Sequence, residues 1–129
     1  MSSTSLYLAI AAGGASGACA RYALSLSVSR LWPGSFAAGT LAVNVLGALL
    51  IGVLFVLIHD RALLPESLKP LLVTGLLGGF TTFSAFSLET AGHLLEGQYG
   101  QALLYAVLSV SLCVLATLAG ITVTRLLFN

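Results

Sequence analysis

Long apolar runs, separated by short polar stretches, dominate the chain. Residues 36–58 and 97–124 contain no Asp, Glu, Lys or Arg, and each exceeds the roughly 20 residues that a helix needs to cross a bilayer. Arg21 is the one charged residue of 6–29, and residues 70–88 are uncharged but rich in glycine and hydroxyl groups. The pattern predicts an all-α membrane protein with four transmembrane helices, near residues 6–29, 36–58, 70–95 and 99–126.

The connections between these runs are short and have turn or interface chemistry. They read "RLWPGS", "HDRALLPESLK" and "EGQYGQ". We therefore expect residues 1–129 to form a single four-helix transmembrane unit. The opening "MSSTS" lacks the basic residues of a signal peptide, so we expect the first apolar run to be retained as a span.

Composition excludes several classes of protein. Of the 129 residues, 58% are apolar and 7% are charged, which is too apolar for a soluble domain. A formal net charge of +1 offers no basic face for nucleic acid. Cys19 and Cys113 lie far apart with no metal-ligand spacing, so they are interpreted as small packing residues.

The positive charges do not choose an orientation. The side that would hold the N-terminus also holds Arg61, Lys69 and Arg125, whereas Arg21 and Arg30 belong to the other side. Two readings stay open: the chain inserts both ways and pairs with an inverted copy, or a modest preference escapes this comparison.

Polar residues recur along one side of the second and fourth predicted spans. Thr40, Asn44 and Gly47 share a helix face at i, i+4 and i+7, and Tyr105 and Ser109 are spaced i, i+4. Asn44 could tie helices together or line a pore. Ser109 could contribute to a pore or bond the carbonyl one turn earlier.

The first span carries a close-packing signal followed by a charge. Gly13 and Gly17 form a G-x-x-x-G pair, which lets two helix backbones approach. Arg21 follows on the next turn, and a guanidinium is costly in lipid. It must therefore snorkel, pair with a glutamate or line an aqueous vestibule, where it would attract anions.

The third span contains the unusual stretch "GGFTTFSAFS", residues 78–87. Its glycines weaken the helix, and a break at membrane depth is tolerated only where the freed backbone faces protein, ion or water. Freed carbonyls could hold a small cation. Freed amides, together with the hydroxyls of Thr81, Thr82, Ser84 and Ser87, could hold an anion.

Aromatic rings and a carboxylate accompany this stretch. Phe80, Phe83 and Phe86 recur every third residue, so they are expected to stack along one side with electropositive ring edges available to an anion. Glu89 lies just beyond. It is a functional candidate if it is intramembrane, and a helix-end charge if it lies at the interface.

These motifs carry a family resemblance. The stretch "GGFTTFSAFSLET", with "GTLAVN" in the second span and "GGASGACAR" in the first, resembles the Fluc/CrcB family of small fluoride channels. The resemblance covers nearly the whole chain. It implies four-helix subunits with a broken third helix, paired as an antiparallel, dual-topology homodimer around a structural sodium ion.

The resemblance also implies roles for particular residues. The carbonyls of Gly78 and Thr81 would bind sodium, Phe83 and Phe86 would present ring edges to fluoride, and Arg21 would lie near a vestibule. The remaining polar pore lining would comprise Asn44 as amide donor, Ser109 as hydroxyl donor, and Thr40, Thr82, Ser84, Tyr105 and Glu89.

The resemblance implies a function that is not enzymatic. The protein would export fluoride passively across the cell inner membrane and so confer fluoride resistance. One alternative is a four-helix proton-coupled multidrug antiporter, which would need a carboxylate in the first span, and none precedes Asp60. The other is a nonconducting membrane subunit in which Asn44 and the glycines only hold helices together.

Overall fold

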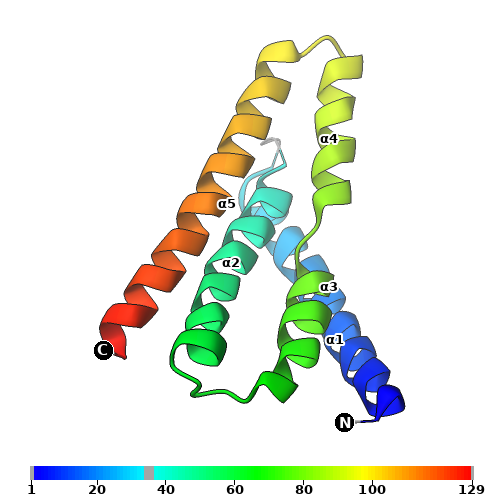
Figure 1. The fold of residues 1–129 in the computed structure, drawn as a ribbon. Helices are drawn as coiled ribbons and strands as arrows, with labels where there is room; N and C mark the ends of the chain where they lie inside the picture. The colour runs from blue at the N-terminus through cyan, green and yellow to red at the C-terminus, as the bar shows by residue number, and fades with distance from the viewer. Residues whose placement is uncertain (1, 34–36, 129) are drawn as a thin grey trace.

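The structure, a computed structural model, describes residues 2–33 and 37–128, and in these ranges the chain is helical apart from short connections (Figure 1). The elements are α1 (Ser3–Leu31), α2 (Ala38–Phe55), η1 (Val56–Asp60), η2 (Glu66–Leu68), η3 (Pro70–Leu77), α3 (Gly78–Phe80), α4 (Phe83–Leu95) and α5 (Tyr99–Leu127). The segments η1 and η3 are wound as π-helices and η2 as a 3-10 turn. Phe36, the expected start of the second span, lies outside the described residues.

Three of the helical runs are long and apolar enough to cross a membrane. They are Ala38–Asp60, Glu66–Leu95 and Tyr99–Leu127. Helix α1, which precedes these three runs, has 29 residues and a length of about 43 Å, but its serines, glycines and arginines make it less apolar than they are. The chain is thus an all-helical membrane protein in the part that the structure describes.

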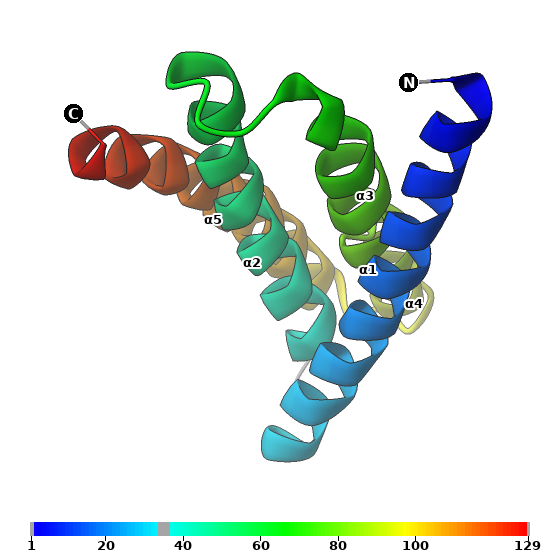
Figure 2. The same cartoon turned by 90° about the horizontal axis from the view of Figure 1, so that it is seen from below.

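The helices associate as two pairs. Helix α2 lies along α5, and α1 lies along η3 and α3, as the two views agree (Figures 1 and 2). The two termini and the connection between α2 and η3 lie at the same end of the molecule (Figure 1). At that end Arg125 Nε pairs with Asp60 Oδ2 at 2.6 Å, which ties α5 to η1.

Glycines make the contact between α1 and the third helical run of the chain, Glu66–Leu95. A Cβ at Gly17 would collide with the carbonyl of Leu76, and one at Gly79 would collide with the carbonyl of Gly14. The α2–α5 pair has the same character, because a Cβ at Gly52 would collide with the carbonyl of Thr117. Small residues therefore let the backbones touch, which is how helices associate where lipid removes the hydrophobic driving force.

Few large side chains are fully buried in the part of the chain that the structure describes. Val43, Val56 and Tyr105 are completely covered, whereas many leucines and valines along the helices are exposed. Such an outward-facing apolar surface is suited to lipid or to a second membrane-embedded chain.

Candidate ion-conducting site

The helical run Glu66–Leu95, the third of the chain counting α1, is interrupted near its middle. Helix α3 ends at Phe80, the backbone is extended at Thr81 (φ −82°, ψ 157°) and Thr82 (φ −149°, ψ 118°), and α4 begins at Phe83. Paired glycines weaken the end of the first segment, and Thr82 caps the second by accepting a hydrogen bond from Ala85 N at 3.1 Å through Oγ1. The local residue types thus account for both sides of the interruption.

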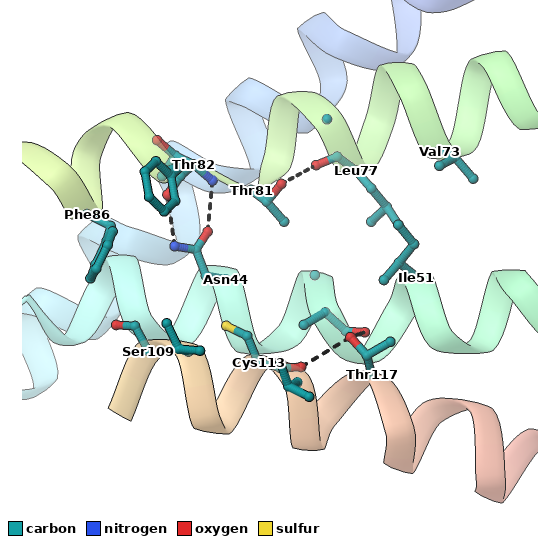
Figure 3. Close-up of a pocket in the computed structure, with 16 residues that line it drawn as sticks. Asn44, Ile51, Val73, Leu77, Thr81, Thr82, Phe86, Ser109, Cys113 and Thr117 are labelled. Carbon is teal, nitrogen blue, oxygen red and sulfur yellow. Dashed lines mark hydrogen bonds between the residues drawn. The ribbon is translucent and has the colours of Figure 1, made fainter. Parts of the chain in front are cut away.

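Asn44 on α2 binds the backbone of the interruption (Figure 3). Its Nδ2 donates to the carbonyl of Thr82 at 2.9 Å, and its Oδ1 accepts from Thr82 N at 2.8 Å. Asn44 also lines the adjacent cavity. The two readings of Asn44 from the sequence are therefore compatible, since one side chain joins two helices and faces an open space.

Two carbonyls at the interruption lose their usual helical donors. In a continuous helix Gly78 O would receive the N–H of Thr82, but that group donates to Asn44. Thr81 O would receive the N–H of Ala85, but that group donates to the hydroxyl of Thr82. These are the two carbonyls for which the resemblance implies sodium binding, and oxygen atoms of this kind suit a hard cation.

Arg21 reaches the interruption from α1. Its Nε donates to the carbonyl of Gly79 at 3.0 Å, and the residue is half-buried. The guanidinium therefore meets a backbone carbonyl at the end of a helical segment, where a cation is electrostatically favourable. This partner, a backbone carbonyl of the interrupted helix, is not among the alternatives that the sequence suggested for Arg21.

A cavity of about 460 Å³ opens beside the interruption (Figure 3). Its polar wall includes Asn44, Thr81, Thr82, Ser109, Cys113 and Thr117, and its apolar wall includes Phe83 and Phe86. The hydroxyl of Ser109 is buried and has no hydrogen-bond partner among the described residues. Ser109 is thus not bonded to the carbonyl one turn earlier, and its oxygen stays available to a ligand.

The phenylalanines divide into two groups. Phe83 and Phe86 have ring centroids 5.3 Å apart, and Phe86 continues to Tyr105 at 5.1 Å. Phe80 lies before the interruption and is 7% exposed, whereas Phe83 is 77% exposed. The expectation of a three-ring stack including Phe80 is wrong, because spacing by three applies only within a continuous helix.

A second polar cluster surrounds Glu89. Its carboxylate accepts a hydrogen bond from Thr40 Oγ1 at 2.7 Å and another from the hydroxyl of Tyr105 at 2.6 Å. Glu89 also borders a separate cavity of about 230 Å³, together with Gly92, His93 and Glu96. Glu89 therefore belongs to a half-buried hydrogen-bond cluster between three helices, and it is not an isolated helix-end charge.

Ser84 has a more peripheral position. Its hydroxyl lies 3.3 Å from Thr82 Oγ1, and the residue is exposed and outside the lining of the larger cavity. The structure places Ser84 next to the interruption, on the exposed surface of the chain.

Two features of the site were missed in the sequence. Cys113 and Thr117 line the larger cavity, although Cys113 was interpreted as a packing residue only. Gly75 and Gly79 form a second G-x-x-x-G pair, which packs on Gly13 and Gly14 in α1. The spacing of that second pair is visible in the sequence and predicts close helix packing.

Known proteins match this chain over nearly its full length. The model of the family described as "CrcB-like protein, Camphor Resistance (CrcB)" matches residues 8–121. The chain belongs to the CrcB family. The "Fluoride-specific ion channel FluC" of Magnetococcus marinus is 50% identical over 118 residues, which is 92% of this chain and 96% of the relative.

Other relatives of this CrcB chain are also named "Fluoride-specific ion channel FluC". That of Pseudomonas fluorescens is 47% identical over 121 residues, covering 94% of this chain and 98% of the relative. That of Paracoccus denitrificans is 47% identical over 122 residues, covering 95% and 96%. In this CrcB chain, segments 13–21, 39–44 and 78–90 meet at the interruption, through Arg21, Asn44 and Thr82.

Proposed function

We propose that this CrcB protein is a fluoride-selective channel that conducts passively. The observation that carries the proposal is the near full-length similarity to relatives named fluoride-specific ion channels. The site supports it, because the larger cavity is lined by hydroxyl, amide and aromatic groups and its lining residues include no carboxylate. An anion there meets hydrogen-bond donors and no acidic side chain.

Donors in that cavity are available to replace the water around a small anion. The amide of Asn44 has two N–H groups, and one of them binds Thr82. The hydroxyl of Ser109 has no partner among the described residues. Phe83 and Phe86 can add electropositive ring edges. Fluoride is tightly hydrated, so a pore that admits it must offer such substitutes.

The functional unit in this proposal is an antiparallel homodimer of four-span subunits, with the third span broken at Thr81 and Thr82. Phe83 is 77% exposed although it lines the cavity, so a second copy packed on this face would enclose its ring. The weak difference in positive charge between the two sides is compatible with insertion in both orientations. Each copy would then contribute the same surface to the interface.

A sodium ion is proposed as a structural component at the centre of the dimer. The carbonyls of Gly78 and Thr81 would hold it, because both have lost their helical donors. Bound there, sodium would supply a fixed positive charge that makes the interior more favourable for an anion.

The proposed location is the cell inner membrane. Passive export would protect cytoplasmic enzymes when fluoride accumulates inside the cell, and would so confer fluoride resistance. The lining of the larger cavity includes no Asp, Glu, Lys, Arg or His, which supports conduction down a gradient.

Ion efflux from liposomes tests this proposal. Purified protein in sodium-containing liposomes should release fluoride far faster than empty vesicles and should retain chloride. Loss of a multidrug substrate driven by a proton gradient, with no fluoride release, would support the antiporter instead. A homodimer that releases neither ion would support the nonconducting subunit.

A further inference from the structure

Arg21 is a charged residue that contacts the interrupted helix directly. We propose that Arg21 is a positioning residue for the cation site: by holding the carbonyl of Gly79, it fixes the backbone from which Gly78 and Thr81 present theirs. The inference rests on the sodium ion of the proposed function. It assigns Arg21 to the helix interruption and not to the attraction of anions.

The contact joins residues 58 positions apart in the chain. Arg21 Nε lies 3.0 Å from Gly79 O, and the side chain is half-buried between α1 and the third run. A hydrogen bond with a charged donor is roughly twice as strong as a neutral one. The carbonyl of Gly79 is therefore held by a charged donor.

The position of Arg21 depends on the glycine contact one turn earlier. A Cβ at Gly17 would lie 2.8 Å from Phe80 N, and a Cβ at Gly79 would lie 3.0 Å from the Cα of Gly14. With no side chains between them, the two backbones are at their closest separation. This separation places a side chain at position 21 within reach of the end of α3.

A fixed Gly79 carbonyl matters because glycine does not restrain its own backbone. Gly78 and Gly79 lack a Cβ, so their peptide groups can adopt many orientations once helical hydrogen bonding stops. Asn44 holds the far side of the interruption at Thr82, and Arg21 holds the near side at Gly79. The carbonyl of Gly78 lies directly before the first held point, and that of Thr81 lies between the two.

The charge and the hydrogen bond of Arg21 predict opposite effects on a cation. The positive charge should weaken sodium binding by repulsion, whereas the hydrogen bond should strengthen it by preorganising the ligands. Two substitutions separate these effects. In Arg21→Gln the amide nitrogen occupies the position of Nε and can still donate, and in Arg21→Met a methyl group occupies that position and cannot.

The experiment measures binding of ²²Na⁺ to the purified full-length protein, together with the sodium dependence of fluoride efflux from liposomes. We expect Arg21→Gln to bind sodium at least as well as wild type. We expect Arg21→Met to need about tenfold more sodium than Arg21→Gln for half-saturation, which corresponds to about 1.4 kcal/mol. Arg30→Met, an exposed arginine on the same helix, should bind sodium like wild type.

Equal sodium affinity of Arg21→Gln and Arg21→Met would overturn the inference, as would tighter binding by Arg21→Met. If Arg21→Met does not yield a dimer, Arg21→Leu takes its place, since its side chain ends before the position of Nε and has no donor. If wild type conducts fluoride but binds no sodium, this inference is overturned and the proposed channel function is retained. If wild type binds sodium but does not conduct fluoride, the proposed channel function is overturned, and the comparison of Arg21→Gln with Arg21→Met still decides the role of Arg21.

Discussion

Asn44 and Thr82 exchange two hydrogen bonds, one through each side of the asparagine amide, at 2.9 and 2.8 Å. The pair joins residues 38 positions apart and replaces the helical hydrogen bonding that stops at Thr82. An amide is well suited to this contact because it carries a donor and an acceptor on one planar group. The structure of the interruption therefore depends on α2 as much as on its own segment.

Asn44→Asp should damage both stability and conduction. The aspartate can accept from Thr82 N but, when ionised, cannot donate to its carbonyl, and it adds negative charge to the cavity. We expect a loss of about 1–3 kcal/mol in unfolding free energy and at least a tenfold drop in fluoride efflux. Unfolding in detergent and liposome efflux measure the two, and Leu46→Ala, at an exposed position of α2, should change either only slightly. Wild-type behaviour of Asn44→Asp would contradict the interpretation.

Ser109→Ala should separate stability from conduction. Because the Ser109 hydroxyl is buried without a partner among the described residues, removing it breaks no hydrogen bond and should leave the unfolding free energy unchanged or slightly raised. If the hydroxyl serves fluoride, efflux should fall several-fold. Ser111→Ala, at an exposed position of the same helix, is the matched control. A clear loss of stability with normal efflux would show that the hydroxyl has a structural partner.

Glu89 and Tyr105 should be energetically coupled. Tyr105→Phe keeps the ring that packs on Phe86 but removes the donor to Glu89, and Glu89→Gln weakens the acceptor. A double-mutant cycle on unfolding free energy should give a coupling of about 0.5–3 kcal/mol, the range expected for residues in direct contact. Additive effects would mean that this hydrogen bond contributes little to the native state.

Phe83→Ile should slow fluoride efflux and leave the dimer intact. The substitution removes the aromatic edge and keeps apolar bulk at a position that lines the larger cavity. Leu88→Ile is a suitable control, because Leu88 is 76% exposed on the same helix and lies outside that cavity. Efflux measurements and size-exclusion chromatography should be made on both variants. Equal efflux from Phe83→Ile and wild type would assign Phe83 to packing alone.

Gly17→Ala should destabilise the subunit. The added Cβ would collide with the carbonyl of Leu76, and backbone atoms cannot rotate away as a side chain can. We expect a loss of about 1–3 kcal/mol in unfolding free energy. Gly100→Ala, in α5 with nothing within 4 Å of the new methyl group, should be neutral or stabilising. Unfolding followed by the fluorescence of Trp32 compares the two variants.

Local signals in the sequence mark residues 78–82 as unfavourable for a continuous helix. Paired glycines and consecutive hydroxyl residues at 78–82 weaken a helix wherever they occur, and the structure has its extended residues at Thr81 and Thr82. In the described residues, helical segments also cover most of the four predicted ranges, with a gap at Thr81 and Thr82, and three of the runs are long and apolar enough to cross a membrane. These features depend on neighbouring residues, so no knowledge of the rest of the chain was needed.

The contacts that complete the site could not be predicted in the same way. The partners of Arg21 and Asn44 lie 58 and 38 residues away, and which carbonyl or amide each one meets depends on how the helices pack. The predicted stacking of Phe80 on Phe83 and Phe86 was wrong for a local reason. Its expected stacking assumed helical spacing across a point where the helix stops.

The glycine contact between α1 and the third run has a consequence for conformational entropy. Glycines have no rotamers to immobilise when they meet another backbone, so their part of this contact loses no side-chain freedom. The close contacts of Gly17 with Leu76 and of Gly79 with Gly14 are made by backbone atoms. Warming the membrane should loosen this interface less than it loosens one built from leucines.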